Sequence, residues 1–147
     1  MRTMLSTIVA LVVLVCSGFA AEIKSTTKLT VIAPNASQLI EVTDADVLRL
    51  SHVYAGNFIG PEASEPDATL TRYTITFDIQ TLDGVKTGAY AVQYCVNQPT
   101  GEGFLYLPGK GDSQYRRNIS TILRDEQDGT WRRASDEWSA AIKPYLR

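Results

Sequence analysis

RYTITFDIQTLDGVKTGAYAVQYCV, residues 72–96, is the stretch that decides the fold. Its first half alternates apolar and polar residues with a strict period of two, which is typical of a β-strand that buries one face. The second half follows Asp83-Gly84, a dipeptide that suits a two-residue hairpin turn because both residues tolerate positive φ. The stretch therefore predicts a β-hairpin.

This turn fixes a register that the rest of the stretch supports. If Leu82 pairs with Val85, aromatic and β-branched side chains meet across the two strands on one face. A slip of one residue would instead turn Thr and Asp side chains into the core. The predicted pairs are Phe77 with Tyr90, Ile75 with Val92 and Tyr73 with Tyr94.

The opposite face of the hairpin is the first candidate binding surface. It mixes hydrogen-bonding groups with small side chains such as Ala89 and Ala91, which leave room for a ligand or a protein partner. An ordinary solvent-facing sheet has the same composition, so that interpretation stays open. The side chains predicted for this partner face are Thr74, Thr76, Asp78, Gln80, Gln93 and Cys95.

Cys95 is the one cysteine between residues 21 and 147, so no disulfide can form within that part of the chain. The predicted register places Arg72 opposite Cys95, and a nearby guanidinium would favour the thiolate if the site were exposed. Cys95 is therefore either a buried, inert thiol or a weakly reactive one that could link two copies into a homodimer.

Elements before and after the hairpin are expected from local patterns. Residues 28–33 are rich in β-branched side chains and predict a strand, and residues 103–107 are apolar on both faces, as in a more central strand. Thr43 is a credible N-cap for a helix over residues 44–54. Residues 61–67 are polar and contain prolines, which is typical of a solvated linker.

The last third of the chain predicts further elements. Residues 115–124 and 130–135 favour a second hairpin, although the apolar spacing of the first segment fits a helical turn equally well. Ser135 can cap a C-terminal helix near residues 136–143, and Pro144 ends it.

Together these elements predict one α+β domain. The expected sheet is antiparallel, has four to six strands and contains the 72–96 hairpin as part of a meander. The helix near 44–54 and the C-terminal helix near 136–143 are expected to pack on its aromatic face. Such a domain fits a chain of 147 residues.

The first twenty residues have the layout of a secretory signal peptide. Arg2 gives a positive start, residues 8–16 form an unbroken apolar run, and Gly18 and Ala20 place small side chains before the Ala20–Ala21 bond. Cleavage there predicts a periplasmic or secreted domain over residues 21–147, with no stable membrane span.

Two other interpretations of this segment remain open. Roughly 18 uncharged residues are long enough for an uncleaved membrane anchor. A lipid anchor on Cys16 is also conceivable, but Val15 stands where a lipoprotein has a small residue.

The net charge of the chain is mildly acidic, with 14 basic and 16 acidic side chains. General nucleic-acid binders carry a clearly basic face, so nucleic acid is not an expected partner. Basic side chains nevertheless gather late in the chain, where they form a candidate anion patch unless each is simply solvated. Its members are Lys110, Arg116, Arg117, Arg132 and Arg133.

The sequence offers little for catalysis. His52 is the one histidine, and its place in the predicted helix favours solvent exposure or a capping role. The turn at residues 108–112 lacks the spacing of a phosphate-binding loop, and residues 125–129 miss the pattern of a calcium loop. We therefore predict no catalytic residue, no metal site and no cofactor.

The expected function is that of an exported, non-enzymatic binding protein that contacts a protein or a small molecule. The alternative is a small carboxylate-dependent hydrolase of the cell envelope, since glycosidases need only two positioned acids. Geometry can distinguish the two. An enzyme should bring two carboxylates together in a cleft, and a binding protein should present an open face or an apolar groove.

Overall fold

The computed structural model describes residues 25–35, 37–52, 57–118 and 128–147. The predicted signal peptide, residues 1–20, lies outside these ranges. Within them the protein is mostly an antiparallel sheet of seven strands with three short α-helices. The predicted α+β class is confirmed at this level, and the expected count of four to six strands is wrong.

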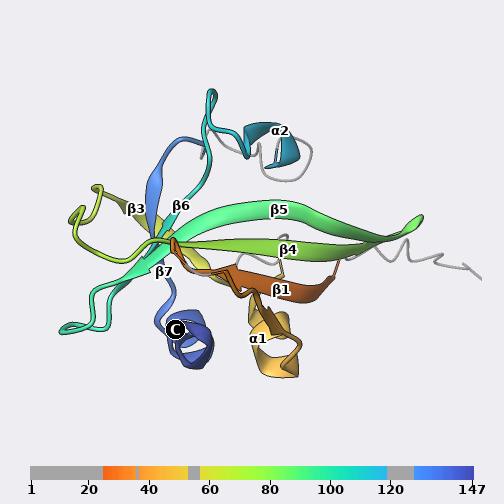
Figure 1. Ribbon diagram of the computed structural model, residues 1–147, viewed down its shortest axis with the longest axis horizontal. Helices are drawn as coiled ribbons and strands as arrows, with labels where there is room; N and C mark the ends of the chain where they lie inside the picture. The colour runs from red at the N-terminus through yellow and green to blue at the C-terminus, as the bar shows by residue number, and fades with distance from the viewer. Residues whose placement is uncertain (1–24, 36, 53–56, 119–127) are drawn as a thin grey trace, which may run out of the picture.

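The sheet has the lateral order β2-β1-β4-β5-β6-β7-β3, so β2 and β3 form its two edges (Figure 1). Its strands are β1 (Thr26–Ile32), β2 (Ile40–Val42), β3 (Ile59–Ala63), β4 (Tyr73–Thr81), β5 (Gly84–Val96), β6 (Gly103–Tyr106) and β7 (Trp131–Ala134). The helices are α1 (Ala45–Leu50), α2 (Tyr115–Asn118) and α3 (Asp136–Ile142), and a short 3-10 turn, η1 (Lys143–Tyr145), follows α3.

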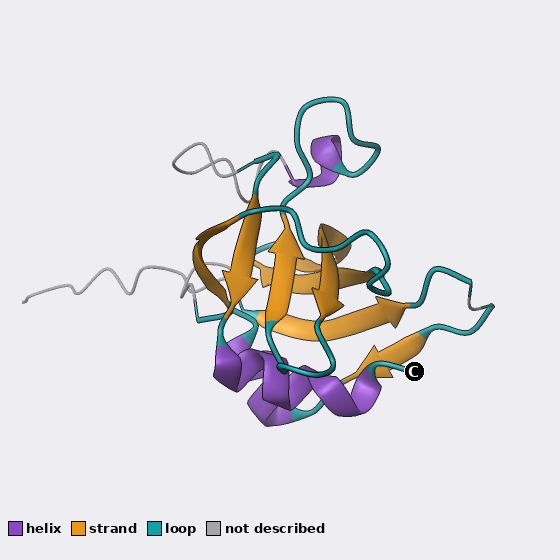
Figure 2. Ribbon diagram, turned by 90° about the vertical axis from the view of Figure 1, so that its left-hand side faces the viewer, coloured by secondary structure: helices purple, strands orange, loops and turns teal. Residues whose placement is uncertain are grey.

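The helices lie on opposite sides of the sheet. Helices α1 and α3 are together on one side, whereas α2 stands on the other, above β5 (Figures 1 and 2). No helix of the described segments is long and apolar enough to cross a membrane.

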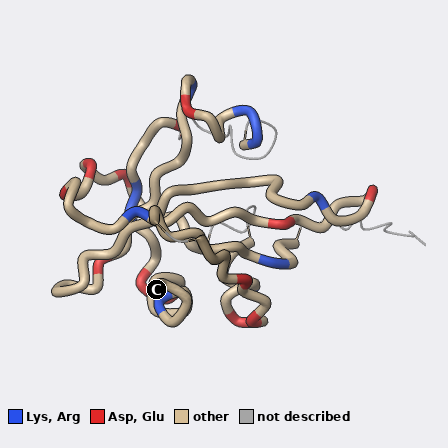
Figure 3. The backbone as a smooth tube through the Cα atoms, in the orientation of Figure 1, with Lys and Arg blue, Asp and Glu red and all other residues tan. Residues whose placement is uncertain are grey.

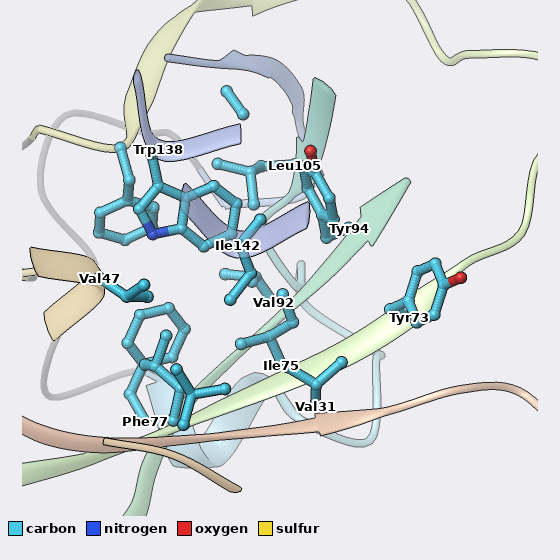
Figure 4. Packing of buried hydrophobic residues seen from close by; sticks show 14 of the residues in the cluster. Val31, Val47, Tyr73, Ile75, Phe77, Val92, Tyr94, Leu105, Trp138 and Ile142 are labelled. Atoms are coloured by element: carbon cyan, nitrogen blue, oxygen red, sulfur yellow. The ribbon is translucent and has the colours of Figure 1, made fainter. Parts of the chain in front are cut away.

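The hydrophobic core lies between the sheet and the α1/α3 side. Ile75 and Phe77 of β4 are buried, and Trp138 of α3 lies on the same side of them as Val47 of α1 (Figure 4). The Trp138 indole N–H donates to Ser51 Oγ at 2.8 Å in this interior, which ties α3 to the end of α1. Apolar area buried in this way is the main source of stability for such a domain.

The central hairpin has the predicted register in its middle. Tyr73 pairs with Tyr94, Ile75 with Val92 and Phe77 with Tyr90, so all three predicted pairs are confirmed. Their side chains are buried on the core face.

The predicted turn of this hairpin is wrong by one residue. Thr81 pairs with Gly84, so Leu82 and Asp83 form the turn. A bulge absorbs the offset, because Ile79 pairs with Lys86 although Phe77 pairs with Tyr90. The physical reason is a side-chain bond: Asp78 accepts a hydrogen bond from the N–H of Gly88 at 2.6 Å, and Gly88 has a φ of 54°.

Helix α1 is shorter than predicted and has a different cap. Asp44, not Thr43, is the N-cap, since its carboxylate accepts from the N–H groups of Asp46 and Val47 at 3.0 and 3.1 Å. The helix ends at Leu50 rather than at residue 54. His52 follows the helix, and its Nδ1 accepts a hydrogen bond from the Thr26 N–H at 3.3 Å.

Two strands that flank the hairpin, β1 and β6, agree with the prediction from the sequence, and a third, β3, does not. β1 covers most of the predicted 28–33 strand, and β6 lies in the interior of the sheet, as expected for residues apolar on both faces. The predicted linker at 61–67 is wrong in its first three residues, which belong to β3. A proline is tolerated there because β3 is an edge strand.

The predicted hairpin over 115–124 and 130–135 is wrong where the structure describes it, whereas the alternative of a helical turn agrees with residues 115–118. Residues Tyr115–Asn118 form helix α2, and β7 pairs with β6 and β3. Residues 119–127 lie outside the described ranges. The cap of α3 is confirmed: Ser135 Oγ accepts from the Trp138 N–H at 3.2 Å, and η1 then continues through Pro144.

Candidate functional site

The predicted partner face lies on the side of the sheet opposite the core, which we call the outer face. Thr74 is opposite Gln93 in the ladder and Thr76 is opposite Ala91, so Thr74, Thr76 and Gln93 are neighbours, and all three are half-buried. Gln80 is exposed near the hairpin tip and donates to the Thr81 carbonyl at 3.0 Å. The other two members of the face are buried.

Asp78 is one of these buried members and is 5 % exposed. Besides holding the bulge, its carboxylate lies 3.6 Å from Lys28 Nζ, and the same ammonium lies 2.7 Å from Glu41. The hydrogen bond to Glu41, together with the charges of Glu41 and Asp78, raises the pKa of Lys28. The two carboxylates thus share one cation in a structural ion-pair network.

Cys95 is the second buried member, with a side chain that is 0 % exposed. Burial raises the pKa of its thiol to about 11, although the charge of Arg72 acts in the opposite direction. A protonated thiol is a poor nucleophile. The geometry therefore favours the inert interpretation of Cys95.

Aromatic and cationic side chains lie on the part of the outer face formed by β6 and β7. The rings of Tyr106 and Trp131 are 5.2 Å apart, and the guanidinium of Arg72 lies 4.9 Å from the centre of the Trp131 ring. Arg72 also forms an ion pair with Glu65 at 2.9 Å, and Tyr106 donates to Asp112 at 2.8 Å. These groups already have partners within the chain.

The predicted anion patch is divided by the fold. Arg116 and Arg117 are exposed on α2 and Lys110 is exposed in the preceding loop, whereas β7 carries the other two arginines. Arg132 donates to the Gly60 carbonyl at 2.8 Å, and Arg133 is ion-paired with Glu102. The Lys and Arg positions accordingly lie at separate places along the backbone tube (Figure 3).

A groove of about 550 Å³, which the sequence did not predict, lies where edge strand β2 meets η1. Leu39, immediately before β2, is 58 % exposed at this groove. Gln38, Glu41 and Arg147 contribute polar groups. The apolar residues that line it are Val31, Ala33, Leu39, Ile40, Pro144 and Tyr145.

The sequence carried only a weak signal for this groove. Leu39 and Ile40 form an apolar pair after a turn-forming segment, but such a pair is usually buried. Their exposure depends on where the C-terminal residues pack. We call this site the β2 groove.

A second hollow, of about 440 Å³, lies between α3 and the loop that joins β5 to β6. Two carboxylates line it, from Glu102 and Asp136. Glu102 is bound by Arg133, and Asp136 stands in the first turn of α3, where a carboxylate stabilises a helix. Both acids therefore have structural roles.

Within the described segments, no group of three or more His, Cys, Asp or Glu side chains is placed to hold a metal ion. No family model, curated protein or solved structure matches the chain.

Proposed function

We propose that this chain is an exported, non-enzymatic binding protein, periplasmic or secreted, that takes its partner in the β2 groove. The observation that carries the proposal is the exposure of Leu39 beside an apolar hollow of about 550 Å³. Ligand sites in proteins are mostly apolar clefts of about 300–1,000 Å³ with a few polar groups at the rim. The β2 groove has both properties.

The energetics of covering Leu39 support a partner of some size. Burying a whole leucine side chain contributes about 1.5–3 kcal/mol, so covering the exposed part of Leu39 contributes about 1–2 kcal/mol. Micromolar binding needs about 8 kcal/mol. A partner must therefore also cover neighbouring groups such as Ile40 and Tyr145.

The outer face is a second, weaker candidate for the surface that binds a partner. Thr74, Thr76 and Gln93 are the part of the predicted partner face that stays half-exposed. The arginines beside them are paired with acids or stacked on rings, so they have less to offer a partner.

The alternative, a carboxylate-dependent hydrolase, would have to use Glu102 and Asp136 in the second hollow. An acid pair of this kind needs one carboxyl group free to hold and release a proton. The Glu102 carboxylate already forms an ion pair with the Arg133 guanidinium. We therefore prefer the binding protein.

Site-specific photocrosslinking tests the proposal. A photoreactive phenylalanine analogue at position 39, in protein produced and exported by its native cells, should form a covalent adduct that mass spectrometry identifies. Position 82 is the matched control, because Leu82 is also an exposed leucine but lies at the hairpin tip. Equal labelling from both positions, or labelling from neither, would contradict a partner site at the β2 groove.

The exported state has its own test. Fractionation should find the protein in the periplasm or the medium, and N-terminal sequencing should begin at Ala21. A protein that keeps residues 1–20 in the membrane would instead support the anchor interpretation.

A further inference from the structure

The β2 groove lies next to an unpaired strand edge. β2 forms a ladder with β1 through Leu29–Val42, Thr30–Glu41 and Val31–Ile40. On its other side β2 has no strand partner in the part of the chain that the structure describes. The free N–H and C=O groups of such an edge can template a further strand.

The groove is on the core side of that edge. Val42 is buried and Ile40 packs against the core cluster, whereas Glu41 between them bonds to Lys28 on the outer face. A strand added to β2 would direct every second side chain to the same side as Ile40 and Val42. Those side chains would enter the apolar hollow between β2 and η1.

From this arrangement we infer that the β2 groove binds an extended segment of another protein, which pairs with β2 as an additional strand and places an aliphatic side chain in the hollow. The inference rests on the proposed function and names its class of partner. Backbone hydrogen bonds would provide general affinity, and the hollow would provide selectivity for the side chain.

A second copy of this chain fits the edge less well. β2 is three residues long and Glu41 is its centre, so a symmetric antiparallel pair of β2 strands would bring two Glu41 residues together. Like charges directly opposite each other destabilise a sheet. The Glu41 side chain is 63 % exposed and bound to Lys28 on the outer face, where it would lie beside the residue paired with it on an added strand.

Charge indicates what the partner segment carries. Arg147 is exposed at the groove and forms no ion pair with any residue that the structure describes. A carboxylate near the aliphatic side chain would complement it. Opposite Glu41 a neutral or basic residue fits. The expected segment thus has aliphatic residues two apart, a neutral or basic residue between them and an acid at one end.

A random heptapeptide library displayed on phage tests this chemistry, with the exported protein as target and the Leu39→Gln variant as counter-selection. Enriched peptides should show the alternating pattern. A synthetic copy should bind about tenfold more weakly to Leu39→Gln, and binding to Leu82→Gln should be unchanged. In ¹H–¹⁵N NMR spectra the peptide should shift and protect the backbone amides of β2.

A second peptide, with N-methyl groups on alternate residues, separates strand addition from simple occupancy of the hollow. Methylation removes the donors that a ladder needs, so binding should fall at least tenfold. If it does not, strand addition is wrong while the groove remains a binding site. If sedimentation instead shows a dimer that Leu39→Gln abolishes, a second copy is the occupant and the inference is wrong.

An absence of enriched peptides would overturn the inference even if position 39 still crosslinks a non-peptide ligand. Loss of the crosslink as well would overturn the proposed function. The folded state of each variant is checked by its circular dichroism and thermal unfolding, since Leu39 is too exposed for its replacement to unfold the protein.

Discussion

The two edges of the sheet are built differently. At β3, the preceding Phe58 is buried in the core with 0 % exposure, its carbonyl accepts from the Ser135 N–H at 3.0 Å, and Pro61 has no N–H to offer a further strand. At β2, the preceding Leu39 is mostly exposed and no proline interrupts the strand. We call the β3 edge, which is tied to the core and carries a proline, the closed edge, and the β2 edge, which lies beside the groove, the open edge.

The largest expected effect comes from breaking the closed edge. Phe58→Ala removes a ring that packs against Phe77 and Trp138 at centroid distances of 5.5 and 5.6 Å. We expect the free energy of unfolding to fall by about 3–5 kcal/mol in urea titrations. Leu39→Ala at the open edge is the control and should cost about 0.5 kcal/mol or less. Similar losses for the two variants would remove the distinction between the edges.

The outer face around Cys95 should be closed to reagents as well. Because the thiol pKa of Cys95 is raised from 9.0 to about 11, its thiolate fraction at pH 8 is about 100-fold below that of a free cysteine. Native protein should therefore react with a thiol reagent at least about 100-fold more slowly than unfolded protein. Rapid reaction of the native protein would show that the Cys95 thiol is accessible and would contradict its burial.

The same shift predicts a pH dependence of stability. The pKa of the Cys95 thiol is higher in the folded state than in the unfolded state. The stability that the protonated thiol contributes is therefore complete below about pH 9 and is lost as the pH rises towards 11. Cys95→Ser, compared by thermal melts across this range, should show a smaller alkaline loss than the parent protein.

A smaller effect is expected from crowding the closed edge. A Cβ at Gly60 would lie 2.9 Å from the backbone oxygen of Arg133, on the neighbouring strand β7. Gly60→Ala should therefore force β3 away from β7 and lower the free energy of unfolding by about 1–3 kcal/mol. Ser37→Ala, an exposed change beside the open edge, should leave the urea midpoint nearly unchanged. An unaffected midpoint in Gly60→Ala would show that the β3–β7 contact is loose.

The smallest effect on stability is expected at the open edge itself. Leu39→Gln should change the free energy of unfolding by about 0.5 kcal/mol or less and yet weaken partner binding about tenfold. A residue that serves binding and not folding should show this combination of a small loss of stability and a large loss of affinity. A large loss of stability would instead identify Leu39 as part of the core.

Local patterns in the sequence predicted the structure best. The alternation from Tyr73 to Ile79 predicts a strand with one buried face, and the Ser135 cap predicts the start of α3. Both depend on contacts between residues close in the chain or directly across one turn. The misplaced turn shows the limit, since the bond from Asp78 to the Gly88 N–H shifts the end of the hairpin without any change in the alternation.

Short strands with distant partners were missed for a related reason. β2 and β3 have three and five residues, too few for a clear period. β3 exists because it pairs with β7, about 70 residues further along the chain, as in the contact of Arg132 with the Gly60 carbonyl. No local pattern contains that information.

The candidate site also depends on contacts between segments that are far apart in the chain. The groove joins a segment near residue 39 to one near residue 145, and Leu39 looks like any other core leucine in the sequence. The predicted partner face was drawn from alternation alone, which says which side chains share a face but not which of them are covered. Asp78 and Cys95 share that face and are nevertheless buried.

By itself, the sequence determined the α+β class, the pairing in the middle of the central hairpin and the two faces of the sheet, because these depend on the period of two and on short-range hydrogen bonds. Only the tertiary structure decided which edge is open, which polar side chains already have partners and where an apolar hollow remains. Those properties depend on how segments far apart in the chain pack together, and burial is a property of that packing rather than of any one residue.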